Sequence, residues 1–280
     1  MPPTITLLTD FGDRGGYVGM LHGVIQTLCP GATVIDLTHA VTPQAIREGA
    51  FLLHNAYSYF PPDTIHVAVV DPGVGTERRP ICLAVPGIGQ FIGPDNGLFT
   101  AILETHPDTE ARVIANPEYS VQRLGKEISR TFHGRDIFAP TAALLARGEP
   151  FAAVGPPIAT AALTRLPNFW PEWEPVDPGQ ERLLGAVVHI DSFGNLITNI
   201  RRERFAAAIP EQLAEAWVTT PFHTCTGLST TYGDHPPDSL LALFGSFNTL
   251  EIARVNSRAD RGPQGQALPL GLLVEVKMWL

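Results

Sequence analysis

The apolar run from Ile65 to Val70 constrains the fold more than any other feature of the chain, because it stops abruptly at Asp71. A continuous apolar run of this length is typical of a strand that covering helices bury on both faces. A proline and two glycines follow between Asp71 and Arg79, so the chain turns where the strand ends. An acid at the end of such a strand is typical of functional sites in open α/β sheets.

Strand-like and helix-like segments alternate through the first half of the chain. Periodicity and turn residues predict strands at residues 4–8, 33–37, 65–70 and 81–85, and helices at 17–28, 42–57 and after residue 97. We expect Thr42 to cap the second helix, with Pro43 in its first turn. The alternating order predicts a mostly parallel sheet flanked by helices.

The second half of the chain changes character at residue 166. Residues 166–180 hold four prolines and show no periodicity, which is typical of a semi-rigid connector. Short β-like runs separated by turn residues follow, as in a small sandwich or barrel. We therefore predict an α/β protein with an N-terminal α/β domain (residues 1–165), a Pro-rich linker (166–181) and a smaller C-terminal β-barrel-like domain (182–280).

Charge and cysteine content exclude several kinds of partner and site. The 280 residues carry a formal net charge of −9 and no Lys/Arg block, so we expect no nucleic-acid partner. No apolar stretch reaches the roughly 18 residues that span a bilayer and no signal peptide is visible, so we expect no membrane association. Three dispersed cysteines support neither disulfides nor a thiolate metal site, which predicts a cytoplasmic protein.

Asp71, Arg78 and His133 form the most informative group of chemically active side chains. The glycines before Arg78 let the chain fold back, and an arginine beside an aspartate keeps the carboxylate ionised and oriented. His133 stands just ahead of a predicted helix, whose dipole favours the neutral imidazole. Together the three residues could bind and polarise a water molecule. An ion pair that only holds a loop explains the same spacing equally well.

Polar and aromatic side chains at other turns are candidate ligand contacts. Asp10 ends the first predicted strand, where a carboxylate can accept two hydrogen bonds from a ribose diol; a helix cap is the alternative. Phe193 could stack on a base and Asn195 could bind its edge, unless both belong to a plain Asx-rich turn. Ser246 and Phe247 could clamp a small polar ligand, or they simply form a turn between two strands.

Three common kinds of site are missing from the sequence. No His-x-x-x-His or Cys-x-x-Cys pair is present, so we expect no metal site. The chain also lacks a Gly-x-Ser-x-Gly elbow and a phosphate-binding loop that ends in Gly-Lys-Ser/Thr. These sequence features argue against a serine hydrolase and against a phosphorylated cofactor.

Five segments resemble the S-adenosyl-L-methionine hydroxide adenosyltransferases, which are relatives of fluorinating and chlorinating enzymes that act on the same substrate. The segments occur in the family's order across nearly the whole chain: Thr9–Gly12, Val70–Thr76, Pro94–Leu98, Thr131–Pro140 and Phe193–Asn199. The resemblance implies that water or hydroxide attacks C5′ of S-adenosylmethionine, giving adenosine and methionine without a cofactor. It also implies a homotrimer, with each active site between the N-terminal domain of one subunit and the C-terminal domain of its neighbour.

The resemblance also implies which nucleophile is used. Asp71, Arg78 and His133 match the family's water-activating triad, and these positions are altered in the halogenating relatives. Water has a pKa of about 15.7 and must lose a proton, whereas a halide does not. The fluorinating enzymes also carry an insertion near residues 86–90 that this chain lacks. Hydrolysis is therefore the expected reaction, and halogenation is a less favoured alternative.

Further roles follow from the same resemblance. Asp10 would hold the ribose hydroxyls of the substrate. The C-terminal domain would contribute contacts to the methionine part (Asp191 and Ser246), contacts around the adenosine (Phe193 and Asn195) and one side chain that lines the pocket (Phe247).

The chain departs from the family's pattern in three places. Gly15 stands where family members carry an acid that grips the methionine amino group, so either Asp13 compensates or the grip is weaker. Asn248-Thr249 replaces a usual Gly-Tyr pair, and residues 256–268 depart from the small-residue pattern near adenine. These departures affect substrate affinity more than the type of reaction. They leave a non-catalytic protein that binds S-adenosylmethionine or adenosine as a further alternative.

Overall fold

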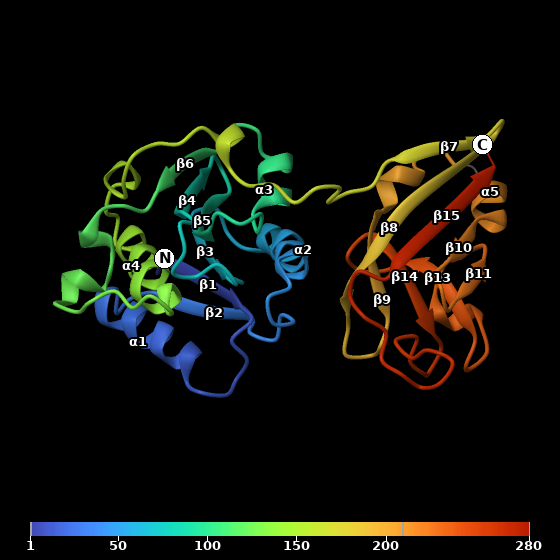
Figure 1. Cartoon of the computed structure of the whole chain (residues 1–280), viewed down its shortest axis with the longest axis horizontal. Helices are drawn as coiled ribbons and strands as arrows, with labels where there is room; N and C mark the ends of the chain where they lie inside the picture. The colour runs from blue at the N-terminus through green and yellow to red at the C-terminus, as the bar shows by residue number, and fades with distance from the viewer. Residues whose placement is uncertain (1, 209, 280) are drawn as a thin grey trace. The chain divides into compact units, whose positions relative to one another are not determined.

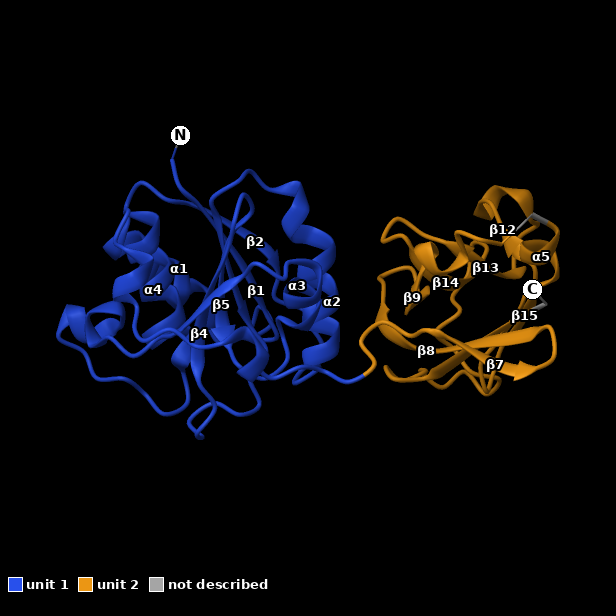
Figure 2. Cartoon of the chain, turned by 90° about the horizontal axis from the view of Figure 1, so that it is seen from above, with its two compact units in different colours: residues 1–167 blue, residues 168–280 orange. Residues whose placement is uncertain are grey.

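The structure is a computed structural model that describes residues 2–208 and 210–279. Two compact units, residues 1–167 and 168–280, each have their own sheet and their own hydrophobic core (Figure 2). The first unit combines a sheet with covering helices, and the second is mainly β-structure.

The first unit is built on a six-stranded sheet with the order β2-β1-β3-β5-β4-β6. Its strands are β1 (Thr4–Thr9), β2 (Thr33–Thr38), β3 (Thr64–Val69), β4 (Pro80–Val85), β5 (Gly89–Pro94) and β6 (Glu110–Val113). Strands β2, β1, β3 and β5 run parallel, whereas β4 is antiparallel to both of its neighbours. The mostly parallel sheet predicted from the sequence is confirmed.

Helices cover both faces of this sheet (Figure 1). Helices α1 (Tyr17–Leu28) and α4 (Ala139–Ala146) pack against each other on one face, and α2 (Ile46–Ala56) and α3 (Thr100–Thr105) pack on the other. Helix α2 begins later than expected, because Gln44 has a φ of +67° and interrupts the helical backbone. The prediction that Thr42 caps this helix is therefore wrong. The backbone amide of Thr42 instead donates to the carboxylate of Glu48 at 2.8 Å.

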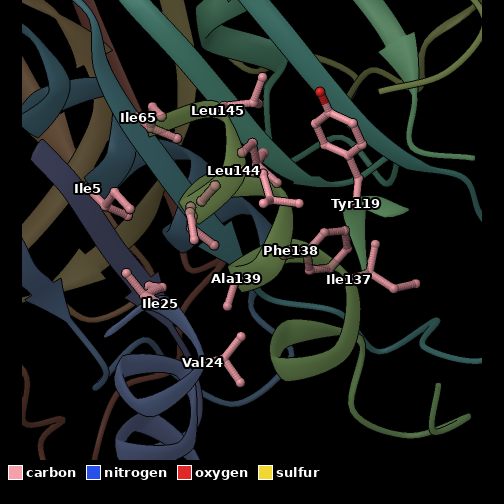
Figure 3. Packing of buried hydrophobic residues seen from close by; sticks show 14 of the residues in the cluster. Ile5, Val24, Ile25, Ile65, Tyr119, Ile137, Phe138, Ala139, Leu144 and Leu145 are labelled. Carbon is pink, nitrogen blue, oxygen red and sulfur yellow. The ribbon is translucent and has the colours of Figure 1, made fainter. Parts of the chain in front are cut away.

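The main core of the first unit lies between the sheet, α1 and α4. Figure 3 shows Ile5 and Ile65 of the strands, Ile25 of α1 and Leu144 of α4 in one buried cluster. Burying a large aliphatic side chain contributes about 2 kcal/mol to stability. This packing fixes the sheet and α4, and with them the loops that carry the candidate site.

The second unit has a nine-stranded sheet. Its strands are β7 (Trp173–Asp177), β8 (Gln180–Ile190), β9 (Leu196–Arg201), β10 (Trp217–Thr219), β11 (Thr224–Thr226), β12 (Leu228–Ser229), β13 (Leu240–Phe244), β14 (Thr249–Arg254) and β15 (Leu273–Trp279), with helix α5 at Pro210–Glu215. The first half of β8 pairs with β15 and its second half with β9, so one long strand joins both parts of the sheet. The expected barrel-like architecture is confirmed.

The Pro-rich range 166–181 is not all connector. Strand β7 lies within it and pairs with the start of β8, while the indole nitrogen of Trp173 donates to the carbonyl of Arg204 at 2.7 Å. Proline is tolerated in β7 because this strand pairs on one side only. None of the described helices has the length and apolar character that a membrane span requires.

Candidate active site

Asp10 and Asp71 lie at the same edge of the first unit's sheet. Strands β1 and β3 are adjacent and parallel, with Thr9 opposite Val69. Asp10 follows Thr9 directly, and Asp71 lies two residues beyond Val69. Both acids therefore follow the carboxyl ends of neighbouring strands, where open α/β sheets bind their ligands.

The loop after β3 doubles back through a tight turn. The amide and the hydroxyl of Thr76 donate to the carbonyl of Gly73 at 3.2 and 2.7 Å. Gly75 has a φ of +78°, and a Cβ at this position would lie 2.3 Å from the carbonyl oxygen of Arg130. Only glycine fits here, because the backbone is left-handed and another backbone approaches closely.

The turn brings the guanidinium of Arg78 onto the carboxylate of Asp71. Nε of Arg78 donates to Oδ1 and Oδ2 of Asp71 at 3.0 Å each, and Nη2 donates to Oδ2. The side chains of Arg78 and Asp71 are only 8 % and 5 % exposed. The ring of Phe138 supports the guanidinium, whose central carbon lies 5.4 Å from the ring centroid. A buried ion pair with several contacts holds both groups in one orientation.

His133 completes a cluster of three residues. Nη2 of Arg78 lies 2.8 Å from Nδ1 of His133. Because a guanidinium cannot accept a hydrogen bond, Arg78 must donate, and the neutral imidazole carries its proton on Nε2. Burial, followed by the charge of Arg78, lowers the pKa of His133, so the ring is neutral near pH 7. The structure thus brings Asp71, Arg78 and His133 together.

A helical turn with a buried acid positions His133. This residue stands directly before the π-helical turn Gly134–Phe138, which continues into α4. Within the turn, the buried carboxylate of Asp136 accepts hydrogen bonds from the amide of Ser129 at 2.8 Å and from Nη2 of Arg135 at 2.9 Å. These contacts fix the segment that leads into the helix, and so they orient the imidazole toward the guanidinium.

Asp10, Asp71 and His133 line one cavity of about 300 Å³ in the first unit. Phe11 and Phe132 form part of its wall, and their rings meet edge to face with centroids 5.7 Å apart. These apolar rings lower the polarity around the carboxylates and strengthen electrostatic interactions in the cavity.

Two polar atoms near this cavity retain the capacity to bind a ligand. Oδ2 of Asp10 accepts a hydrogen bond from the amide of Gln44 at 2.8 Å, and among the described residues its Oδ1 has no partner. Nη1 of Arg78 is buried and has no hydrogen-bond partner within the described part of the chain. Leaving a buried donor unpaired is costly, so a ligand atom that accepts from Nη1 is favoured. An oxygen with negative charge fits this requirement best.

The five candidate residues of the second unit line a single cavity of about 750 Å³: Asp191, Phe193, Asn195, Ser246 and Phe247. They belong to the turn between β8 and β9 and to the turn between β13 and β14. Antiparallel pairing of β9 with β14 and of β14 with β13 connects these turns through one sheet. Residues that are about 50 positions apart in sequence therefore share one wall.

Asp191 organises the first of these turns. Its Oδ1 accepts from the amides of Phe193 and Asn195 at 3.0 and 2.9 Å, and its Oδ2 accepts from Nδ2 of Asn195 at 2.9 Å. The Asx-rich turn considered from the sequence is therefore present, and it forms part of the cavity wall. The turn leaves Phe193 74 % exposed, which suits an aromatic stacking partner.

Glu251 and Tyr232 line the same cavity and were not predicted from the sequence. Glu251 lies on β14, is buried, and accepts a hydrogen bond from the hydroxyl of Tyr232. Burial raises the pKa of Glu251, the hydrogen bond from Tyr232 opposes this shift, and the charge of Asp191 adds to it. The one available signal was an acid between Leu250 and Ile252, within a run from Leu250 to Ala253 that is otherwise apolar.

Comparison with known proteins matches both units to domains of one family. The profile of the SAM hydroxide adenosyltransferase N-terminal domain matches residues 5–155, and that of the C-terminal domain matches residues 185–264. An (R)-S-adenosyl-L-methionine hydrolase from Salinispora arenicola is 39 % identical over 258 residues, which cover 92 % of each chain. A fluorinase from an Actinoplanes species is 29 % identical over 223 residues, which cover 71 % of this chain and 72 % of the fluorinase.

A solved structure shares the architecture over almost the full length. An uncharacterized conserved protein from Thermotoga maritima superposes with a TM-score of 0.83 at 34 % identity, covering 97 % of this chain and 99 % of that chain. The two domain profiles match in order, and the fold and the segments quoted above agree with them. The chain belongs to the SAM hydroxide adenosyltransferase family.

Proposed function

We propose that this protein hydrolyses S-adenosyl-L-methionine to adenosine and L-methionine. The observation that carries the proposal is the buried cluster of Asp71, Arg78 and His133 beside a cavity at the carboxyl edge of the sheet. The similarity to a hydrolase of this substrate supports the same reaction for this chain. For a bound water molecule, the cluster supplies the positive charge of a guanidinium, a carboxylate that accepts a hydrogen bond and an imidazole N–H that donates one.

The reaction is an in-line displacement at C5′ of the substrate. A bond forms between the water oxygen and C5′ while the bond between C5′ and sulfur breaks. Its electron pair passes to the sulfonium, which leaves as a neutral thioether and needs no acid. The water must lose one proton, so the protein has to hold the oxygen in line and receive that proton.

We assign a separate task to each member of the cluster. Asp71 accepts three hydrogen bonds from Arg78, and a carboxylate has about four acceptor positions, so Oδ1 can still receive the proton of the water. Nη1 of Arg78 can donate to the oxygen as negative charge develops on it. His133, with its proton on Nε2, orients the guanidinium through Nδ1 and can donate to the same oxygen.

We also propose how the substrate is held. Asp10, with Oδ1 available, would bind the ribose hydroxyls. In the second unit's cavity, the turn formed by Asp191 would present Phe193 and Asn195 to the adenosine. The turn between β13 and β14 would contribute Ser246, which together with Asp191 contacts the methionine part, and Phe247, which lines the pocket.

The complete site would form in a homotrimer, between the first unit of one subunit and the second unit of its neighbour. Candidate residues fall into one cavity in each unit, and the substrate has to reach both sets. The first unit also exposes Tyr17 and Met20 on α1 and Ile35 on the edge strand β2, which suits burial against another copy. Light scattering of purified protein tests the subunit number. The three cysteines are free and buried, in keeping with a cytoplasmic location.

Product analysis tests the proposed reaction. Purified protein is incubated with S-adenosyl-L-methionine, with and without fluoride or chloride, and the nucleoside products are separated. Adenosine as the product under all conditions supports hydrolysis. A 5′-halo-adenosine would instead assign the protein to the halogenating relatives. Ligand binding by calorimetry without any product would assign it to the non-catalytic binders.

A further inference from the structure

Glu251 is the buried ionisable side chain in the second unit's cavity, and the proposed reaction leaves it unexplained. Its side chain lines the cavity although the residue is only 4 % exposed. Oε1 accepts a hydrogen bond from the hydroxyl of Tyr232, and Oε2 has no partner among the described residues. A carboxylate oxygen without a partner at the wall of a cavity favours a cation or a donor that can enter the cavity.

Gly245 leaves room for this carboxylate. A Cβ on Gly245 would lie 1.9 Å from Oε2 of Glu251, so any other residue would displace the acid. Ser246, the next residue, lines the same cavity. Oε2 therefore lies at the wall of the cavity that the turn between β13 and β14 forms.

The other charged groups of the cavity already have hydrogen-bond partners. Asp191 uses both oxygens to accept three hydrogen bonds from its own turn. Nη1 of Arg254 donates to the carbonyl of Asp238 at 2.9 Å, and Arg258 forms an ion pair with Asp260 at 2.8 Å. Oε2 of Glu251, which has no partner among the described residues, is thus the more open acceptor, whereas Asp191 keeps about one acceptor position, on Oδ2, and adds negative potential.

We propose that Glu251 is a specificity-determining residue that binds the primary ammonium group of the substrate's amino-acid part, with Tyr232 positioning its carboxylate. The inference rests on the proposed function, since it takes S-adenosyl-L-methionine as the ligand. An ammonium group has three donors, so it can bind Oε2 of Glu251 and the hydroxyl of Ser246 together. Its charge offsets the two acids of the cavity, which a neutral nucleoside fragment cannot do.

Two stable thioether ligands test this assignment without turnover. S-adenosyl-L-homocysteine carries the ammonium group, and its deaminated analogue lacks it. Calorimetric titration of the full-length protein should show at least a tenfold preference for the ammonium ligand, about the effect of one hydrogen bond to a charged group. In E251Q the preference should fall below about twofold, while the Kd for the deaminated analogue stays within about twofold of wild type.

Glu275→Gln provides a matched control, because Glu275 lies on β15 of the same unit, pairs with Lys277 at 3.1 Å and does not line the cavity. It should keep the full preference. An E251Q protein that also keeps it overturns the proposal. If E251Q does not fold, Tyr232→Phe decides: the preference should fall by about threefold or more, and an unchanged value overturns the proposal. Failure of the proposed function is seen separately, as absence of adenosine formation by the wild-type protein.

Discussion

Arg78 and Asp71 are seven residues apart in sequence and form an ion pair whose side chains are almost completely buried. The adjacent Arg79 points elsewhere, to the carboxylate of Asp95 and the carbonyl of Ala162. Two neighbouring arginines therefore serve different acids, and only Arg78 contacts His133. Removing one partner of a buried pair leaves an uncompensated charge, so both the site and the loop depend on this contact.

Replacing Arg78 by lysine should lower kcat for adenosine formation at least about 100-fold, because a single ammonium cannot contact Asp71 at two points and His133 as well. Steady-state kinetics with S-adenosyl-L-methionine measures this loss. Arg79→Lys is the matched control, since its side chain is partly exposed and lies on another ion pair. It should keep activity within about threefold. Equal losses of kcat in the two variants would show that both arginines act only by holding the loop, and would contradict the role given to Arg78 in the site.

Gly75→Ala should destabilise the first unit by about 3 kcal/mol and reduce activity, because it combines left-handed backbone with a contact of 2.3 Å to Arg130. Gly87→Ala is a control with a φ of +73° and no atom within 4 Å of the added Cβ. It should cost only about 1 kcal/mol and leave kcat unchanged. Urea unfolding measures the free energy of unfolding of both variants. Similar losses of stability in the two would contradict the role given to the Arg130 contact.

The pH dependence of kcat/KM should reflect His133. Burial and the charge of Arg78 lower the pKa of this imidazole below its ordinary value of 6.5, so the neutral form persists into weakly acidic solution. Protonation would force Nδ1 to donate toward Arg78, which itself only donates, and the contact would break. The rate should therefore fall on an acid limb that lies below pH 6.5. An acid limb above pH 6.5, or one that persists in His133→Gln, would count against this role.

His66 should make the first unit less stable in acid. Burial lowers its pKa to about 4, from an ordinary value of 6.5 in the unfolded chain. Between these values the unfolded state binds a proton that the folded state excludes, so stability falls as the pH drops. At pH 5 the loss should be about 2 kcal/mol relative to pH 7. His66→Gln should reduce this loss, whereas the exposed His235→Gln should not; urea unfolding at both pH values measures the difference.

The local pattern of apolar and turn residues was enough to predict much of the fold. Strands β1, β2, β3 and β4 were visible because each is rich in apolar residues and bounded by turn residues. Strand β5 was missed because Gly89, Gly93 and Pro94 interrupt its sequence. Its antiparallel pairing with β4 depends on a tight turn at residues 86–88, which composition does not distinguish from a loop. The left-handed Gln44 likewise leaves no signal in the periodicity of α2.

The candidate site was visible in part. Asp10 and Asp71 could be placed at one sheet edge, because parallel strands end on the same side. His133 is 55 residues beyond Arg78, and its contact depends on α4 packing against the sheet, so the family resemblance was needed to connect them. Glu251 was missed because an acid between two apolar residues is also typical of a strand with one exposed face, so its neighbours do not show that it is buried. The role proposed for Glu251 depends on Tyr232 and Gly245, which come close to its carboxylate only in the folded sheet.

The central claim is that the Asp71 cluster delivers a water oxygen to C5′. The most direct test is adenosine formation from S-adenosyl-L-methionine in ¹⁸O-labelled water, by wild-type protein and Asp71→Asn, with mass analysis of the product. We expect adenosine with one ¹⁸O atom at its 5′-hydroxyl from the wild type, and a rate at least about 100-fold lower for the variant. Adenosine without the label, or equal rates for the two proteins, would contradict it.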